Sequence, residues 1–241
     1  MSFTRWRSLV DGTQINVGAT IPENIVDNFE LDPEQTGADD PFGVWLEGDD
    51  PVDRYPLEFG QTGTFEFLET SDARDGQRVL RNNTDSGEIV SLPGDGLNYY
   101  PQKGDVFEAW LKNHDSGDFQ RAMFLFGASN NESWYGVQVN EPDNVFRISK
   151  DGDGGGDALA ESSVTIGTEW YRVVVEWHDG GGSESDNEIV ATLFDDSGSE
   201  LEQLSVNDDE YESNRGVGWT NTDGSAEVRY DGAYKIGEVG E

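Results

Sequence analysis

The strongest constraint on the fold of this chain is a run of alternating side chains in residues 169–195. Its first half places Tyr171, Val173, Val175 and Trp177 on one side and Arg172, Val174, Glu176 and His178 on the other. A period of two is that of a β-strand. The second half repeats it, with Ile189, Ala191 and Leu193 alternating with Val190, Thr192 and Phe194. The polar, Gly-rich segment 179–187 between them predicts a loop, so the whole stretch is a long β-hairpin. Because both of its faces are rich in apolar residues, a second sheet must cover it.

The rest of the chain supplies the other strands. We predict strands at 24–30, 64–70, 77–81, 87–92, 105–112, 120–126, 133–140, 144–150, 159–166, 201–206, 216–220 and 226–236. Strands at intervals of roughly ten residues without an amphipathic helix are typical of a sandwich or barrel. The unbroken apolar run in 120–126 predicts a strand at the centre of a sheet. Residues 31–60 are interpreted as a long loop pinned by aromatic side chains.

The N-terminal residues 1–23 contain apolar side chains but no sustained period. We interpret them as an arm that lies either on the chain's own sandwich or on a neighbouring subunit. Residues 24–241 then form one lectin-like β-sandwich domain, since no change of composition divides them.

Fifty acidic and fifteen basic residues give a formal charge of −35, yet 34% of the residues are hydrophobic and 11% aromatic. A chain of this composition can bury a core, so the acidity does not indicate disorder. It indicates a halophilic protein, because high salt screens the self-repulsion. The alternative is an acidic surface for a basic partner. Nucleic acid is excluded as a partner, because phosphate binding needs clustered Lys and Arg.

The chain has no cysteine, which excludes disulfides, Cys-bound zinc and thiol catalysis. The N-terminal sequence lacks the apolar stretch of a signal peptide, and no segment is long and apolar enough to span a membrane. If Met1 is the natural start, we do not expect export by the usual routes. Whether it is the natural start stays open.

Four motifs resemble those of a laminin-G-like domain, which has the concanavalin A-like jelly-roll fold of lectins and glucanases. They are Asp27-Asn28-Phe29-Glu30, the segment from Trp134 to Val139, Trp170-Tyr171-Arg172-Val173, and Gly216-Val217-Gly218-Trp219 followed by Tyr230-Asp231-Gly232. The resemblance covers residues 24–238 and is of a type found among haloarchaeal or haloarchaeal-virus surface proteins. It implies an all-β, two-sheet antiparallel sandwich with a concave face that binds carbohydrate or a protein surface.

No catalytic motif accompanies this resemblance. Glycosidases need two carboxylates flanking one bond, and in this architecture they alternate along one strand as Glu-x-Asp-x-x-Glu. That motif is absent, and Glu169 and Glu176 are the only acids in the corresponding strand. Neither histidine, His114 or His178, accompanies a Gly-x-Ser-x-Gly motif. We therefore expect a protein that is not an enzyme.

Glycan binding requires exposed aromatic rings beside hydrogen-bonding side chains. The candidates for such a site are Tyr99, Tyr100, Asn98, Trp134, Gln138 and Trp219. Each aromatic residue among them has a second interpretation as an ordinary core or edge residue, since large apolar side chains are more often buried.

No cofactor is expected, with structural calcium as the one alternative. The loop residues Asp151, Asp153 and Asp157 offer carboxylates to calcium, although their spacing does not fit the EF-hand. Glu30 and Asp231 form a second candidate pair, because the first and last strands of a jelly roll often lie side by side and domains of this type hold calcium there. In both cases solvation of an acidic surface is the competing interpretation.

A lectin-like domain without an export signal suggests a virion surface. We hypothesise a capsid turret, decoration protein or tail fibre of a virus of halophilic archaea, which attaches to a host glycan or glycoprotein. The basic-aromatic cluster Arg5, Trp6 and Arg7 would dock the arm to other virion proteins or to sister subunits in a homo-oligomer. The alternative is a polysaccharide-active enzyme or carbohydrate-binding module of a haloarchaeon, extracellular or cytoplasmic.

The net charge predicts that salt stabilises the folded protein. Because salt screens the repulsion among the excess carboxylates, the free energy of unfolding should rise from dilute buffer to molar NaCl. Thermal unfolding followed by circular dichroism measures this directly. A fully folded protein in dilute buffer, with no gain in molar NaCl, contradicts the prediction.

Overall fold

The computed structural model describes residues 25–27, 29, 55–60, 65–74, 78–83, 87–95, 97, 99–115, 121–130, 132–152, 157–179, 189–221 and 227–240. Within them the chain forms β-strands and no helix. The strands are β1 (Ile25–Asp27), β2 (Leu57–Gly60), β3 (Phe65–Glu69), β4 (Arg78–Asn82), β5 (Gly87–Ser91), β6 (Asp105–Asn113), β7 (Arg121–Asn130), β8 (Ser133–Asn140), β9 (Val145–Gly152), β10 (Asp157–Ser163), β11 (Trp170–Trp177), β12 (Ile189–Phe194), β13 (Glu200–Val206), β14 (Gly216–Asn221) and β15 (Val228–Glu238). The described residues contain no helix that is long and apolar enough to cross a membrane.

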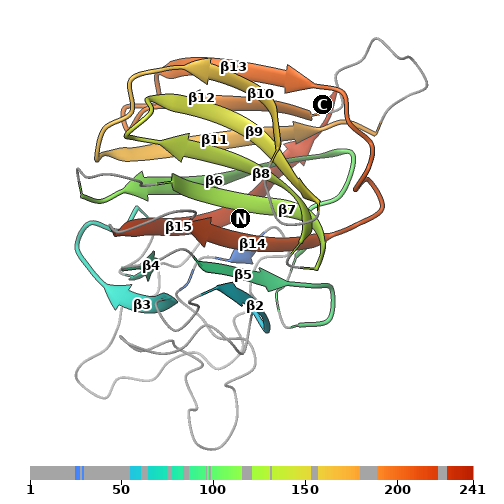
Figure 1. Ribbon diagram of the computed structural model, residues 1–241, viewed down its shortest axis with the longest axis horizontal. Helices are drawn as coiled ribbons and strands as arrows, with labels where there is room; N and C mark the ends of the chain where they lie inside the picture. The colour runs from blue at the N-terminus through green and yellow to red at the C-terminus, as the bar shows by residue number, and fades with distance from the viewer. Residues whose placement is uncertain are drawn as a thin grey trace, which may run out of the picture.

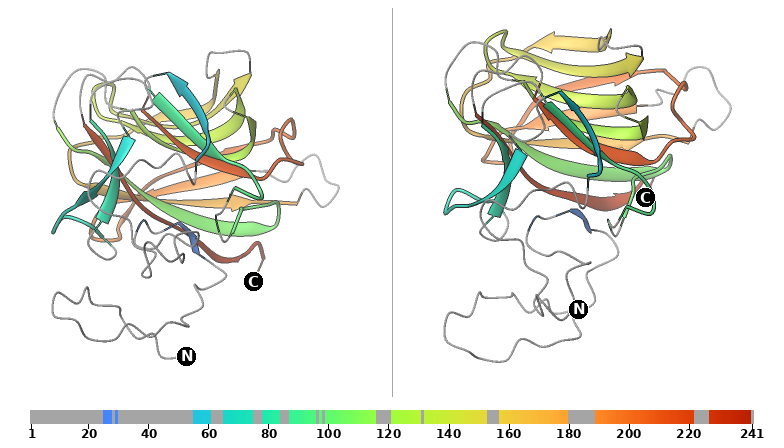
Figure 2. Two further views of the ribbon diagram at one scale, coloured as in Figure 1. Left: turned by 90° about the horizontal axis from the view of Figure 1, so that it is seen from below. Right: turned by 60° about the horizontal axis from the view of Figure 1, so that its bottom comes forward.

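The strands build two antiparallel sheets that lie face to face (Figures 1 and 2). The eight-stranded sheet has the order β13-β12-β11-β6-β15-β4-β3, with β1 also paired to β15, and the seven-stranded sheet has the order β10-β9-β8-β7-β14-β5-β2. In each sheet a strand from the C-terminal part of the sequence lies between two strands from earlier parts. These are β14 between β7 and β5, and β15 between β6 and β4. This nesting is that of a jelly roll, so the expected concanavalin A-like antiparallel sandwich is confirmed.

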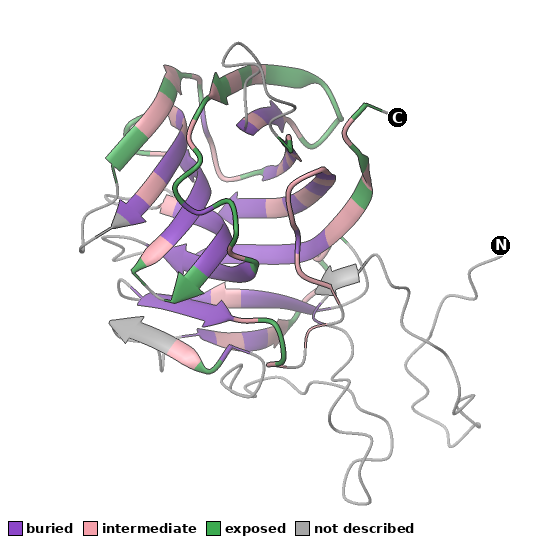
Figure 3. Cartoon of the chain, turned by 90° about the vertical axis from the view of Figure 1, so that its right-hand side faces the viewer, coloured by how far each residue is buried: buried purple, intermediate pink, exposed green. Residues whose placement is uncertain are grey.

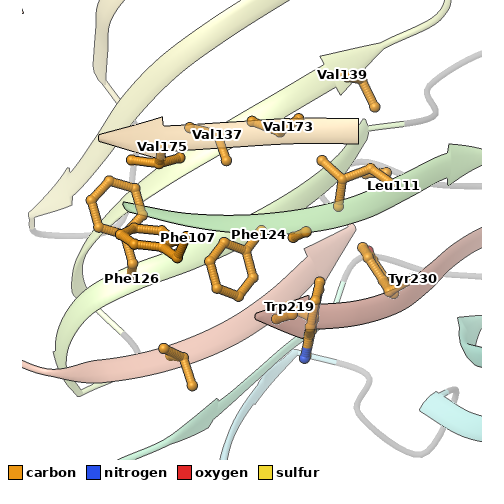
Figure 4. Close-up of a cluster of buried hydrophobic side chains, with 14 of the residues drawn as sticks. Phe107, Leu111, Phe124, Phe126, Val137, Val139, Val173, Val175, Trp219 and Tyr230 are labelled. Carbon is orange, nitrogen blue, oxygen red and sulfur yellow. The ribbon is translucent and has the colours of Figure 1, made fainter. Parts of the chain in front are cut away.

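The alternating hairpin forms as predicted, and it lies in the eight-stranded sheet next to the edge strand β13. Its strands β11 and β12 pair in register from Arg172 with Phe194 to Trp177 with Ile189. The inner row of β11 pairs with β6 as Tyr171 with Leu111, Val173 with Ala109 and Val175 with Phe107, and all six side chains are buried. The inner rows of both sheets therefore meet in one core (Figure 4).

Trp219 of β14 lies at the heart of this core, with none of its surface exposed. Its ring centroid lies 4.9 Å from that of Phe124, 5.0 Å from that of Tyr230 and 5.5 Å from that of Phe29. Its Nε1 donates a hydrogen bond to the hydroxyl of Tyr55 at 3.0 Å. The prediction of Trp219 as an exposed glycan platform is therefore wrong, because the alternation of β14 turns this side chain inward.

Two other expectations for the N-terminal half have different outcomes. The first and last strands do lie side by side, because Asp27 of β1 pairs with Ala233 of β15. The loop predicted to extend to residue 60 is too long, because residues 57–60 form β2 and pair with β5. Residues 1–24 and 30–54 lie outside the described part of the chain.

Buried amides join the two sheets at one open end of the sandwich. Asn221 of β14 donates through Nδ2 to Oδ1 of Asn82 in β4 at 3.3 Å. Asn113 of β6 accepts from the backbone of Ala122 in β7 at 3.3 Å and donates to the carbonyl of Val139 in β8 at 3.4 Å. Buried polar groups are tolerated only when hydrogen-bonded, so these contacts fix how the sheets are aligned.

The outer face of the eight-stranded sheet carries an ionic row. The row runs from β3 to β11 through Glu66, Arg81, Arg229, Lys112 and Trp170, which are successive register partners. Asp72 lies over it, 2.7 Å from Lys112 and 3.1 Å from Arg229. This network holds three of the twelve basic residues in the described part of the chain.

The edge strands are the most solvated part of the sandwich (Figure 3). Alternate residues of β10 and β13 are exposed, and the two strands are joined by a hydrogen bond from Ser162 to Glu202 at 2.8 Å. Polar edges of this kind oppose strand addition by another chain.

The close approach of β14 and β5 predicts a specific sensitivity to a methyl group. A Cβ added at Gly218 would collide with the carbonyl oxygen of Ile89 and lie 3.0 Å from Cγ2 of Val90. Gly218→Ala should therefore lower the free energy of unfolding by roughly 1–3 kcal/mol. Gly237→Ala in β15 is the matched control, because its nearest contact would be an ordinary 4.0 Å to Cβ of Val106. Urea unfolding at constant high salt compares them, and equal midpoints for the two variants contradict the prediction.

Candidate functional site

The candidate site lies on the outer face of the seven-stranded sheet. One row of side chains crosses five strands on this face as Arg147 of β9, Gln138 of β8, Met123 of β7, Thr220 of β14 and Glu88 of β5, each pairing with the next. These residues alternate with the core residues of the same strands, so they face away from the other sheet. In spite of that, Gln138, Met123, Thr220 and Glu88 are all buried.

A hydrogen bond between Trp134 and Glu88 spans this outer face. Nε1 of Trp134 in β8 donates to Oε1 of Glu88 in β5 at 3.1 Å, although β7 and β14 lie between these strands. In a flat sheet, three inter-strand steps of about 4.8 Å separate the two backbones by roughly 14 Å. The bond closes only because the sheet curves toward this face and the side chains converge. The outer face is therefore concave.

Glycine residues make room for this convergence. A Cβ at Gly136 of β8 would collide with Sδ of Met123 and lie 3.0 Å from the ring of Trp134. At Gly218 of β14 it would meet side chains of Val90 and Leu125. The floor of the concavity is consequently a second apolar cluster, formed by Val90, Met123, Leu125, Ala128 and Trp134.

The carboxyl group of Glu88 has a strongly raised pKa. Only 5% of the residue is exposed, and burial raises the pKa of its carboxyl to about 8. The negative charges of Asp151 and Glu132 raise this pKa further, while the hydrogen bond from Trp134 lowers it. A buried carboxyl with a displaced pKa is a candidate for a functional site.

Two polar side chains accompany Glu88 on the concave face. Gln138 is 2% exposed, and its amide makes no hydrogen bond within the described part of the chain. Ser149 of β9, in the neighbouring row, is equally buried. Buried polar groups ordinarily find partners, so an amide held in this recess can bind a ligand.

The structure does not bring the five described glycan-binding candidates together in one site. Trp134 and Gln138 share the concave face, because they lie on one strand at an even spacing, but Trp134 is 2% exposed and so is not an open stacking platform. It forms part of the floor and holds Glu88. Asn98 lies outside the described residues.

The two tyrosines of the pair lie in the loop between β5 and β6, packed against the core. Tyr99 donates to Oδ2 of Asp105 at 2.5 Å, and the hydroxyl of Tyr100 lies 2.9 Å from Oγ of Ser91. Both hydroxyls therefore have structural partners, while glycan binding by these half-buried rings stays a prediction.

The calcium candidates are not brought together among the described residues. Asp151 is buried at the end of β9, where it pairs in register with Trp134, whereas Asp157 is exposed and pairs with Lys150. Asp153 and Glu30 lie outside the described part. Asp231 is buried on the outer side of β15 and accepts a hydrogen bond from the backbone of Arg74. Within the described ranges no three potential metal ligands cluster.

Sequence reasoning missed Glu88 altogether. The strand at 87–92 was predicted, and its one acid between apolar neighbours was the available signal. That signal acquires meaning only from the curvature of the sheet and from the order β5-β14-β7-β8, which no local pattern contains.

Comparisons with known proteins find similarity in fold but not in sequence. No protein-family model matches the chain, and no curated protein matches it. Among solved structures, a GH16 protein of the Bacteroides ovatus mixed-linkage glucan locus has a TM-score of 0.49 and 10% identity, covering 87% of this chain and 98% of that one. A legume lectin-like domain from Entamoeba histolytica has a TM-score of 0.48 and 12% identity, with 80% and 97% covered. The carbohydrate-binding module CBM66 from Bacillus subtilis has a TM-score of 0.47 and 11% identity, with 70% and 91% covered. At these identities the similarity is one of fold.

The raised pKa of Glu88 predicts a specific dependence of stability on pH. Because the folded protein holds this proton more tightly than the unfolded chain, the stabilisation is complete below about 4.5 and is lost as pH rises through about 8. Relative to Glu88→Gln, the wild type should lose stability in this window by up to about 1.4 kcal/mol per pH unit. Urea unfolding of both proteins across the window measures the difference. Parallel pH curves contradict the prediction.

Proposed function

We propose that the protein binds carbohydrate in the concave face of its seven-stranded sheet. The observation that carries this proposal is the pairing of Glu88 with Trp134 across two intervening strands, beside the amide of Gln138. Ligand sites are concave and mostly apolar, with a few polar groups in fixed positions. The apolar floor and the two polar side chains have that composition.

The chemistry of these groups suits a sugar ring. The carboxyl of Glu88 and the amide of Gln138 offer both donors and acceptors to hydroxyl groups, and the floor offers apolar surface to the C–H face of a ring. Lectin- and glucanase-type sandwiches use the same kind of face, which makes carbohydrate the ligand class that the fold suggests.

We propose binding without hydrolysis. One observation favours hydrolysis as a second candidate, because Glu88 is protonated at neutral pH and a second carboxylate, Asp151, lies close enough to raise its pKa. A protonated acid beside a carboxylate is the pairing that glycosidases use. Incubation with neutral and acidic polysaccharides at high salt separates the two: new reducing ends that disappear in Glu88→Gln establish hydrolysis.

The place where the protein works stays a hypothesis. Attachment of a virion to a host-surface glycan is compatible with a carbohydrate-binding face. The arm that would dock the protein to a particle, with Arg5, Trp6 and Arg7, lies outside the described residues. A module of a polysaccharide-active protein fits the same face without a particle.

Replacing the indole that holds Glu88 tests the site. Trp134→Phe keeps a ring in the floor but removes the N–H donor to the carboxyl. We expect glycan binding, identified on an array at molar salt, to weaken by about 0.5–1.5 kcal/mol, the usual contribution of one hydrogen bond. The loss of the bond should also raise the pKa of Glu88 further, because that bond lowers it.

Trp110→Phe is the matched control for this variant. Trp110 lies on the outer face of the other sheet, where it stacks with Arg74 at 4.6 Å. Calorimetric titration of both variants with the same glycan should show a loss for Trp134→Phe alone. An equal affinity in wild type and Trp134→Phe places the binding site elsewhere.

A further inference from the structure

We propose that the concave face selects amino sugars, with the carboxylate of Glu88 binding the ammonium group of the ligand. This inference rests on the proposed function, since it names the class of carbohydrate. It starts from the surroundings of the carboxyl, which has no cation partner within the described residues, whereas the buried carboxylate of Asp105 has one.

The second oxygen of Glu88 is the group in question. Oε1 accepts the bond from Trp134, and no other hydrogen bond or ion pair of this carboxyl is found within the described residues. Glu88 is 5% exposed, and Oε2 is not among the buried side-chain atoms that lack a partner. The proposal places the ammonium group of the ligand at this oxygen.

Asp105 shows what a buried carboxylate normally has in this protein. It is 2% exposed and lies 2.8 Å from Nζ of Lys235, and it accepts hydrogen bonds from Tyr99 and from the backbone of Gln102. A buried charge is tolerated when a cation and hydrogen bonds compensate it. Within the described residues Glu88 has one of these bonds and no cation.

The basic side chains on the same face are engaged elsewhere. Arg147 lies 2.8 Å from Glu161, and Arg121 lies 3.8 Å from Asp143. The charges that act on Glu88 are the carboxylates of Asp151 and Glu132. A ligand carrying a carboxylate or sulfate would add a like charge, whereas an ammonium group would supply the missing cation.

Proton release follows from this pairing. In the free protein the Glu88 carboxyl holds its proton at neutral pH, because burial and the neighbouring acids raise its pKa. An ammonium group at Oε2 favours the carboxylate, so the O–H proton leaves to solvent and the ligand keeps its own protons. Neutral sugars cause no such release.

Calorimetry at mildly acidic pH and molar NaCl tests the proposal. The probes are oligomers of glucosamine and of N-acetylglucosamine of equal length, which differ in the charge of the 2-amino group. Molar salt suppresses the general attraction of any polycation to a protein of charge −35. We expect the glucosamine oligomer to bind at least about tenfold more tightly. Titration in two buffers of different ionisation enthalpy should show release of up to about one proton per site, because a single carboxyl titrates.

Variants assign the preference to one residue. Glu88→Gln keeps the shape and the acceptor for Trp134 but cannot ionise, so it should bind both oligomers equally and release no proton. Glu200→Gln, the same change at an exposed position of β13, should behave like the wild type. Proton release by the wild type carries the test even if Glu88→Gln does not fold.

The outcomes separate this inference from the proposed function. Equal binding of both oligomers without proton release overturns the amino-sugar selection and leaves carbohydrate binding standing. Binding of acidic glycans in preference to both has the same consequence. The absence of binding by every saccharide on an array overturns both proposals.

Discussion

The structure depends on one constraint, which is that the inner rows of two sheets must bury each other. The alternating strands β11 and β6 supply one half of the contact, and β7 and β8 supply the other, so that residues such as Val173, Phe124 and Val137 exclude water together (Figure 4). Neither sheet can do this alone, since a strand with one bare apolar row is unstable in water. In the jelly-roll nesting, β14 and β15 each lie between two strands that come much earlier in the sequence, so each sheet is complete only with its late strand.

This constraint also explains which features could be predicted from the sequence. A period of two is written locally, so nearly all strands and the inner row of the hairpin were predictable. The strand β2 was not, because its four residues, which follow Pro56, carry too little pattern. Trp219 was assigned to the wrong face for a related reason. Alternation shows that a strand has two faces but not which of them is inner, and the small residues Gly216 and Gly218 that mark the outer face of β14 give only a weak signal.

The site was harder to predict because it depends on three-dimensional order. The common strand face of Trp134 and Gln138 could be predicted, since both lie on one strand and differ by an even number of residues. Their partner Glu88 comes from a strand about fifty residues away in sequence, and sequence alone contains neither the strand order nor the curvature that joins them. The place of the tyrosine pair was equally hidden from the sequence. Tyr99 and Tyr100 lie in the loop after β5, and their hydroxyls form hydrogen bonds with Asp105 and Ser91.

The fold alone does not require a carboxyl group at position 88. A structural role in the bond to Trp134 needs only an acceptor, and the amide oxygen of glutamine would provide one without the cost of burying an ionisable group. The carboxyl instead occupies a site where burial and like charges oppose its ionisation. Elsewhere basic residues form ion pairs with buried or half-buried acids, as Lys235 does with Asp105 and Arg172 does with Glu108. An acid that has no such cation within the described residues is best explained by a partner that arrives from outside the chain.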